Sequence, residues 1–146
     1  MTINTRHLVV FVTAVFVAGF AAGTLWQADT AVHAQGEKVF ELRTYTAPEG
    51  KLPNLEARFR DHTMRIFEKH GMSNVGYWVP QDAPASDNTL IYIISHDSRE
   101  QTAANWDSFR ADPEWAEVSR ASQVDGRIVS GVEAVFMDAT DYSPLN

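Results

Sequence analysis

The sequence predicts a single α+β domain, a four-stranded antiparallel sheet with two helices on one face, and three observations support this. Segments with strand and helix periodicity follow one another in the order β-α-β-β-α-β between residues 38 and 138. The composition is that of an ordinary globular protein, with 45% hydrophobic and 21% charged residues. The chain has 146 residues, which is enough for one such domain but not for two.

The first 34 residues differ from the rest and have the pattern of a secretory signal peptide. Residues 8–25 carry no charge, and the small residues Val32 and Ala34 occupy the −3 and −1 positions of a signal-peptidase site. We therefore expect cleavage after Ala34, export to the periplasm or the outside, and a mature domain of residues 35–146. The alternative is a retained membrane anchor at residues 8–25, although such a helix spans only about 27 Å of a hydrocarbon core of about 30 Å.

The first half of the domain predicts a strand, a helix and a second strand. Residues 38–46 alternate with period two, as a strand does. Residues 53–70 carry apolar side chains at helical spacing, with Pro53 suited to the first turn and Gly71 to a C-terminal cap. Residues 73–79 predict the second strand.

The second half of the domain again predicts a strand, a helix and a strand. Residues 89–96 are apolar on both faces and predict a central third strand. The S-x-x-Q capping box at Ser98 opens the second helix, and Asp112-Pro113 interrupts and restarts it. Residues 128–138 predict the fourth strand, which completes the ferredoxin-like arrangement.

The sheet face away from the helices is predicted to be an interface. Tyr45, Trp78 and Tyr92 are assigned to it, and an apolar patch of that size usually marks a contact surface. We therefore expect a homodimer in which two sheets close into one α/β barrel. Arg43, Tyr45 and Glu133 are expected between the sheets, either in a structural polar network in which Glu133 pairs with Arg43, or with Tyr45 as a hydrogen-bond donor to a ligand.

Composition and motifs exclude several classes of function. The formal charge of −7 argues against nucleic acid as a partner, and the absence of cysteine excludes disulfides and thiolate metal sites. The histidine spacing does not support a zinc site, and no phosphate-binding or nucleophile-elbow motif occurs. We expect no metal and no cofactor, and contact with a membrane only if the N-terminal segment is retained.

His62 is the principal candidate for chemistry. It continues the apolar stripe formed by Leu55, Phe59 and Ile66, so the imidazole is expected to face the sheet. There it can act as a base or orient a ligand, or it can be a core histidine satisfied by a neighbouring group.

Aromatic residues and a second histidine extend the candidate site. Trp78, Trp106 and Phe109 either pack in the core and interface or line a cleft for a flat apolar ligand together with Tyr45 and Tyr92. His96 ends the third strand, where it either lines the mouth of a pocket or is an ordinary strand-end residue.

Five segments together resemble the NIPSNAP family over residues 38–146. They are ELRTYT in the first strand, FRDHTMRIFEKHGM in the first helix, VGYW in the second strand, W-x-x-F-R-x-D-P-E-W in the second helix, and the closing DATDYSPL. The resemblance implies the dimeric α/β-barrel fold and a poorly defined molecular activity. Relatives by fold include cofactor-free monooxygenases and haem-binding barrels, which is an analogy at the level of the fold alone.

The function expected is an exported homodimer that holds a small apolar molecule, or only its own partner. The alternative is a cofactor-independent monooxygenase or isomerase that acts on an aromatic or polyketide-like molecule, with His62 as the base. A third hypothesis is haem binding, which needs an exposed histidine over an apolar slot.

Overall fold

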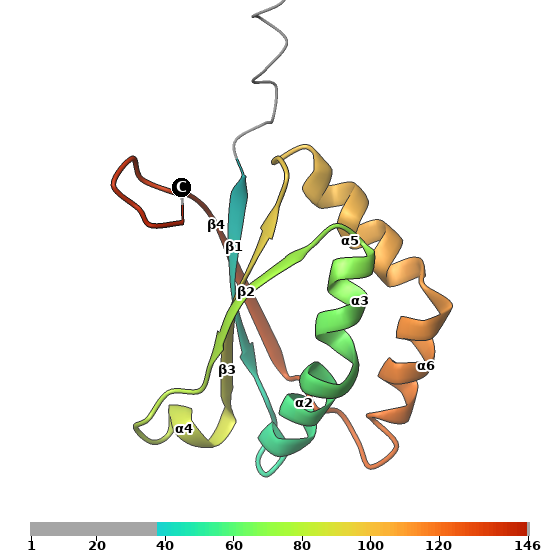
Figure 1. Cartoon of the computed structure of the whole chain (residues 1–146). Helices are drawn as coiled ribbons and strands as arrows, with labels where there is room; N and C mark the ends of the chain where they lie inside the picture. Colours follow the sequence, from blue (N-terminus) through green and yellow to red (C-terminus); the bar gives the residue numbers. More distant parts are fainter. Residues whose placement is uncertain (1–37, 146) are drawn as a thin grey trace, which may run out of the picture. The chain divides into compact units, whose positions relative to one another are not determined.

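The computed structural model describes residues 38–145, which form a four-stranded antiparallel sheet with helices on one face (Figure 1). The strands are β1 (Val39–Thr46), β2 (Ser73–Trp78), β3 (Thr89–His96) and β4 (Gly131–Asp138). Their order across the sheet is β2-β3-β1-β4, which confirms the ferredoxin-like α+β fold and the central position of β3. The predicted signal peptide or anchor of residues 1–34 lies outside the described residues.

The helical layer consists of two broken helices that lie against the sheet. The first comprises α2 (Leu52–Arg58), the π-helical turn η1 (Phe59–Thr63) and α3 (Met64–Lys69), and the second comprises α5 (Gln101–Ala111) and α6 (Pro113–Ala121). A short α4 (Ala85–Asn88) lies in the connection between β2 and β3. Within the described part of the chain, no helix is long and apolar enough to cross a membrane.

The caps of the second broken helix follow the sequence signals, with one shift. Asp112 separates α5 from α6, and its carboxylate accepts a hydrogen bond from the amide of Glu114 at 2.9 Å, as an N-cap does. The hydroxyl of Ser98 accepts from the amide of Gln101 at 3.3 Å. The helix nevertheless begins at Gln101 rather than at Ser98.

The π-helical turn η1 changes which residues of the first helix face the sheet. In a π turn the backbone bonds span one extra residue, so Met64 donates to the carbonyl of Phe59. The hydroxyl of Thr63 donates a hydrogen bond to the carbonyl of Arg58 at 3.1 Å. Arg58 and Phe59 are buried at regular helical spacing after Leu55, and the extra residue then brings Thr63, rather than His62, into the interior.

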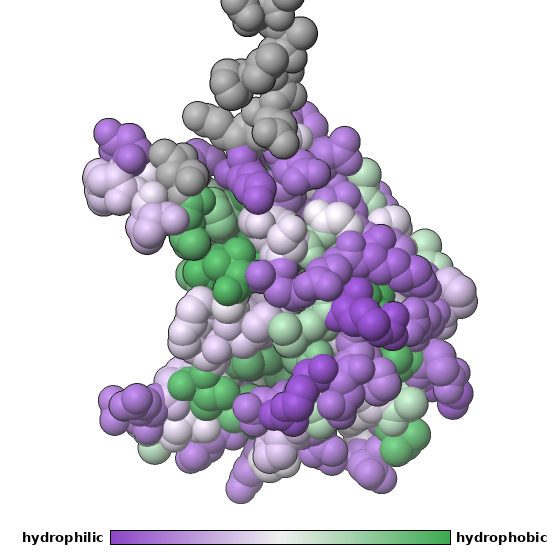
Figure 2. Space-filling view, in the orientation of Figure 1, coloured by the Kyte–Doolittle hydropathy of each residue, from purple (hydrophilic) through white to green (hydrophobic). Residues whose placement is uncertain are grey.

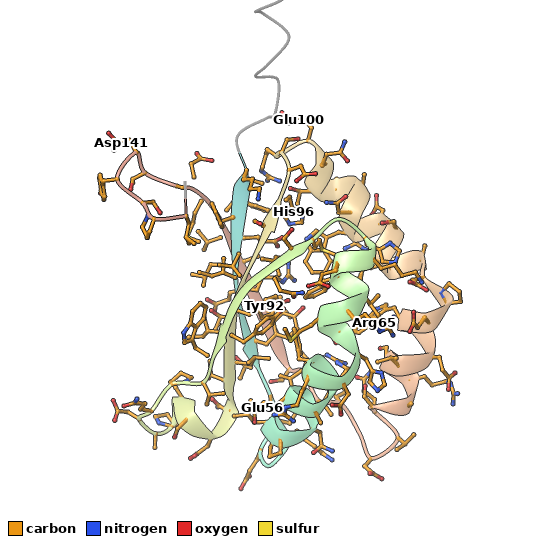
Figure 3. All side chains as sticks on the ribbon, in the orientation of Figure 1. Glu56, Arg65, Tyr92, His96, Glu100 and Asp141 are labelled. Carbon is orange, nitrogen blue, oxygen red and sulfur yellow. The ribbon has the colours of Figure 1, made fainter. Side chains whose placement is uncertain are left out.

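The core between the helices and the sheet is an aromatic cluster centred on Tyr92, in the middle of β3 (Figure 3). The Tyr92 ring lies 5.0 Å from that of Phe59 and 6.0 Å from that of Phe67, measured between centroids. Phe67 in turn contacts Trp106 and Phe109, which are buried as the helical stripe of α5 predicted. These contacts join the two broken helices to the same strand.

The alternation of β1 is as predicted, but the assignment of its two faces was wrong. Arg43 and Tyr45 face the helices, since Arg43 lies over Trp106 and Tyr45 packs on Phe59. Tyr92 faces the same way. The polar members of β1 lie under the helices because α5 and β3 supply hydrogen-bonding partners there, as described below.

The opposite face of the sheet is not covered by the two broken helices, and only the short α4 projects on this side, at one end (Figure 1). Strand pairing places these residues on it: Leu42 and Phe40 of β1, Ile91 and Ile93 of β3, Val135 and Met137 of β4, and Trp78 of β2. We call this set the open face. Trp78 is 51% exposed and Val135 54% exposed, and Figure 2 shows hydrophobic residues along this flank of the molecule.

Part of the open face lies beside the C-terminal segment that follows β4. Leu145 and Ser143 line a shallow hollow of about 250 Å³ together with Phe40, Ile93 and Met137. Most of the apolar surface, including Trp78 and Ile91, lies outside this hollow.

Candidate functional site

Two polar regions lie in the helical layer, and the first is a closed network around Glu41 of β1. Glu41 is 1% exposed, and one of its carboxylate oxygens, Oε2, accepts from the indole of Trp106 at 2.8 Å and lies 3.0 Å from Nε2 of His96. The other oxygen, Oε1, forms an ion pair with Arg43 at 2.5 Å. All the oxygens of this buried carboxylate therefore have partners.

The geometry of the network sets the charge of Glu41. Burial alone would raise the pKa of Glu41, but hydrogen bonds from His96 and Trp106 and the charge of Arg43 outweigh it, so the pKa lies below its usual value. Nδ1 of His96 lies 3.2 Å from the side-chain amide of Asn105, which also donates to the carbonyl of Gly71. The network thus joins β1, β3 and α5.

The predicted pairing of Arg43 with Glu133 was wrong. Glu133 pairs with Thr44 in the β1–β4 ladder and therefore points to the opposite side of the sheet from Arg43. The guanidinium of Arg43 instead stacks 4.3 Å from the Trp106 ring and binds Glu41. Its pKa is raised, because attraction to Tyr45, Tyr92 and Glu41 outweighs the effect of burial.

The second buried carboxylate, Asp112 at the junction of α5 and α6, is also fully engaged. Lys69 and His70 each approach its Oδ2 at 2.7 Å, and Oδ1 caps α6. Hydrogen bonds from Lys69 and His70 hold the pKa of Asp112 well below its usual range. His70 sits at the C-terminus of α3, where capping and this contact account for it.

The second polar region is different, because its central charge has no counter-ion. Arg58 ends α2, is 6% exposed, and forms no ion pair within residues 38–145. Its guanidinium lies 5.2 Å from the Trp115 ring, and Nη1 reaches the hydroxyl of Ser122 only at 3.5 Å. Its Nε has no hydrogen-bond partner among the described residues, and burial lowers its pKa.

Arg58 lines a cleft of about 440 Å³ between the first broken helix and α6. Asn54, Asp61 and His62 contribute from the first helix, and Val118 and Ser122 from α6 and the turn that follows. The cleft is the larger of the two hollows described here and contains the buried cation. A volume of this size suits a small organic molecule.

His62 does not face the sheet, so that prediction was wrong. It is exposed and lines the cleft, because the extra residue of η1 turns it away from the stripe that contains Leu55, Phe59 and Ile66. The haem hypothesis required a histidine over an apolar slot. His62 lies instead beside Asp61 and Arg58, so its position gives that hypothesis no support.

The other candidate residues divide among three places. Tyr45, Tyr92, Trp106 and Phe109 pack between helices and sheet, and His96 is sealed at the end of β3 with 1% exposure (Figure 3). Trp78 lies on the open face, as expected for an interface residue. His62 alone among them reaches the cleft. No group of three or more potential metal-ligating side chains occurs within residues 38–145.

Sequence reasoning missed Arg58, the central residue of the cleft. A charged residue beside Phe59 on a helix normally faces solvent, so the pattern gave no reason to select it. The available signal was the string RFRDHT itself, in which Arg58 precedes the core residue Phe59 and the next core residue is Thr63.

The fold and these motifs define a ferredoxin-like α+β domain. The sequence model of the NIPSNAP family matches residues 40–144, and the chain belongs to this family. No curated protein sequence matches the chain.

Solved structures agree with this assignment. A NIPSNAP family protein with unknown function from Agrobacterium tumefaciens is 24% identical, with a TM-score of 0.65 over 78% of this chain and 97% of that one. An uncharacterized NIPSNAP-like domain protein from Burkholderia xenovorans is 18% identical, with a TM-score of 0.64 over 74% and 90%. A monooxygenase from Streptomyces coelicolor, in complex with Nanaomycin D, shares 17% identity and a TM-score of 0.52 over 73% and 91%. At these identities the likeness concerns the fold.

Proposed function

We propose that this NIPSNAP-domain protein is an exported homodimeric binding module that holds one small molecule in the cleft of each copy. The cleft between the first broken helix and α6 is the observation that carries the proposal. It combines apolar surface from Ala57, Val118 and Ala121 with the buried cation of Arg58. Binding pockets for small molecules typically have this mixture of apolar lining and a few placed polar groups.

The homodimer is supported by the open face. Leu42, Ile91, Ile93 and Trp78 form an apolar surface without a covering helix, and such a surface on one side of a sheet favours pairing with a second copy. The cleft lies in the helical layer, on the other side of the sheet. Pairing through the open face therefore leaves both clefts accessible.

The dimer test compares two valines on one strand. Val135 lies on the open face and is 54% exposed, whereas Val132 lies on the opposite face of β4 and is 48% exposed. We expect light scattering to give twice the chain mass for the wild type and for Val132→Asp, and the single-chain mass for Val135→Asp. A folded monomeric wild type, or equal effects of both changes, would contradict the proposed interface.

Ligand binding is tested by nuclear magnetic resonance on protein purified from the cell envelope after expression of the full chain. We expect a library of small organic molecules to shift amide signals of α2, η1 and α6, with the open face unaffected. The intact mass of the same sample tests export, since cleavage after Ala34 leaves Gln35 as the first residue. Absence of any cleft ligand from the library would contradict the binding module.

The alternative, a cofactor-independent monooxygenase or isomerase, required a second polar group near His62 inside a closed cavity. Arg58 and Asp61 do lie on the same cleft, but the cleft is open to solvent and His62 is exposed. The arrangement therefore favours binding over a reaction that needs water excluded. Turnover of an aromatic substrate that is lost in His62→Phe would favour the enzyme instead.

A further inference from the structure

We infer that the cleft binds the carboxylate of a small monocarboxylic acid, and that Arg58 is the residue that holds it. This inference deepens the proposed function, on which it rests, by naming the chemical class of the ligand. Four observations lead to it.

The first is that Arg58 is a buried charge with no partner. Arginine remains protonated in proteins, so the guanidinium carries its positive charge into the interior. A buried charge without a counter-ion is strongly unfavourable, and buried charges are normally paired. Neither buried carboxylate supplies the pair, because Glu41 is bound by Arg43, His96 and Trp106, and Asp112 by Lys69, His70 and the α6 amide.

The second observation is that Arg58 lines the cleft while its guanidinium is poorly hydrogen-bonded. Nε has no partner within residues 38–145, and the contact of Nη1 with Ser122 is at the limit of a hydrogen bond. The guanidinium lies over the ring of Trp115, so its charge has an aromatic neighbour rather than an acid. A planar fork with free donors matches a carboxylate, which it can bind through two parallel hydrogen bonds.

The third observation concerns the charge of the ligand. Asp61, Glu117 and Asp125 also line the cleft, and among residues 38–145 only Glu117 of these three forms an ion pair, with Arg120 at 2.6 Å. These acids repel a ligand that carries several negative charges, such as a phosphate ester. A single carboxylate that reaches Arg58 satisfies the guanidinium with the least repulsion at the rim.

The fourth observation concerns the rest of the ligand. Ala57, Val118 and Ala121 give the cleft apolar surface next to Arg58, and the volume of about 440 Å³ is at the lower end for organic ligands. A short aliphatic or aromatic body attached to the carboxylate therefore fits the lining. Arg58 directly precedes the π turn η1, and such turns occur frequently at functional sites.

The test is a titration of the nitrogen-15-labelled protein with hexanoate, its neutral isostere hexanamide, and inorganic phosphate. We expect hexanoate to shift the Nε–Hε signal of Arg58 and amides of α6, and to bind at least tenfold more tightly than hexanamide or phosphate. Arg58→Met should weaken hexanoate binding at least tenfold. Arg60→Met, which removes an exposed arginine two residues away, should leave it unchanged.

A second variant keeps the test decisive if Arg58→Met does not fold. Ser122→Asp places a carboxylate next to the guanidinium, so it should compete with hexanoate and abolish its binding while the melting temperature rises. Equal binding of hexanoate and hexanamide, tighter binding of phosphate, or hexanoate binding that survives in Ser122→Asp would overturn the assignment of Arg58 but leave a binding cleft in place. If none of the probes shifts any cleft signal, the inference fails, and the binding module fails with it only when the library also yields no cleft ligand.

Discussion

The Glu41 network and the Arg58 cleft lie in the same helical layer, yet the central charge of the first is paired and that of the second has no counter-ion within residues 38–145. Around Glu41, every carboxylate oxygen has a partner, and β1, β3 and α5 are tied together. Around Arg58, a charge of the opposite sign is buried to a similar degree and touches a ring and one distant hydroxyl. From this difference we expect the first region to stabilise the fold, and we propose the second as the binding site.

Breaking the Glu41 network should have the largest effect on the free energy of unfolding. Glu41→Ala removes the acceptor for His96, Trp106 and Arg43 and leaves a buried guanidinium unpaired, so it should destabilise the protein by about 3–5 kcal/mol. Urea unfolding monitored by circular dichroism measures this free energy. A loss no larger than that of Glu49→Ala, at an exposed position, would mean that the network is not structural.

The next effect compares the two arginines directly. Arg43→Met removes a charged hydrogen bond to Glu41 and should cost about 1.5–3 kcal/mol. Arg58→Met replaces an unpaired buried charge with an apolar chain, so its stability should stay within about 1 kcal/mol of the wild type or increase. The comparison fails if Arg58→Met is the more damaging change in the same unfolding experiment.

Acid should destabilise the protein through its two buried, paired carboxylates. Glu41 and Asp112 both have pKa values lowered by folding, so they stabilise the native state above the pKa values of their unfolded forms, about 4. The free energy of unfolding should therefore fall as the pH decreases below about 5. Glu41→Gln should flatten this slope, measured by urea titrations between pH 6 and pH 3, and Glu49→Gln should not.

The smallest expected effect is at His62, which sequence periodicity placed in the core. Because the side chain is exposed, His62→Phe should change the free energy of unfolding by no more than about 0.5 kcal/mol. If His62 were buried and hydrogen-bonded, the same substitution would lower the free energy of unfolding by about 1–3 kcal/mol. Thermal unfolding of the two proteins side by side distinguishes these outcomes.

The sequence was sufficient for the order of the four strands and the two main helices, because their patterns are local, but it did not indicate α4, the turn η1 or the later start of β4 at Gly131. Strand β3 occupies Thr89–His96 as expected, and Asp112 and Pro113 break the second helix where the dipeptide indicated. The dimer, export and the identity of the ligand stay predictions. The dimer depends on contacts with a second copy, export depends on the N-terminal segment, and the ligand is a separate molecule.

The candidate site was harder to predict, because it depends on which way side chains turn. Period-two alternation separates Arg43 and Tyr45 from Leu42, but it does not say which set the helices cover. That choice is made by Trp106 and His96, which come from distant segments. In the first helix, Leu55, Phe59 and Ile66 fit a regular helix and a helix with a π turn equally well, so the exposure of His62 and the burial of Arg58 could not be read from their spacing.

The turn η1 also affects how this protein should be aligned with others. One residue more or fewer within Phe59–Thr63 leaves the helix continuous, yet it rotates everything that follows relative to Arg58. Two homologues that differ there require a gap in the middle of a helix, a place where alignments usually forbid one. If the residues after the turn set the alignment and no gap is allowed, Arg58 of this chain is paired with a neighbouring position of the homologue. An arginine that both proteins have at this place would then look variable.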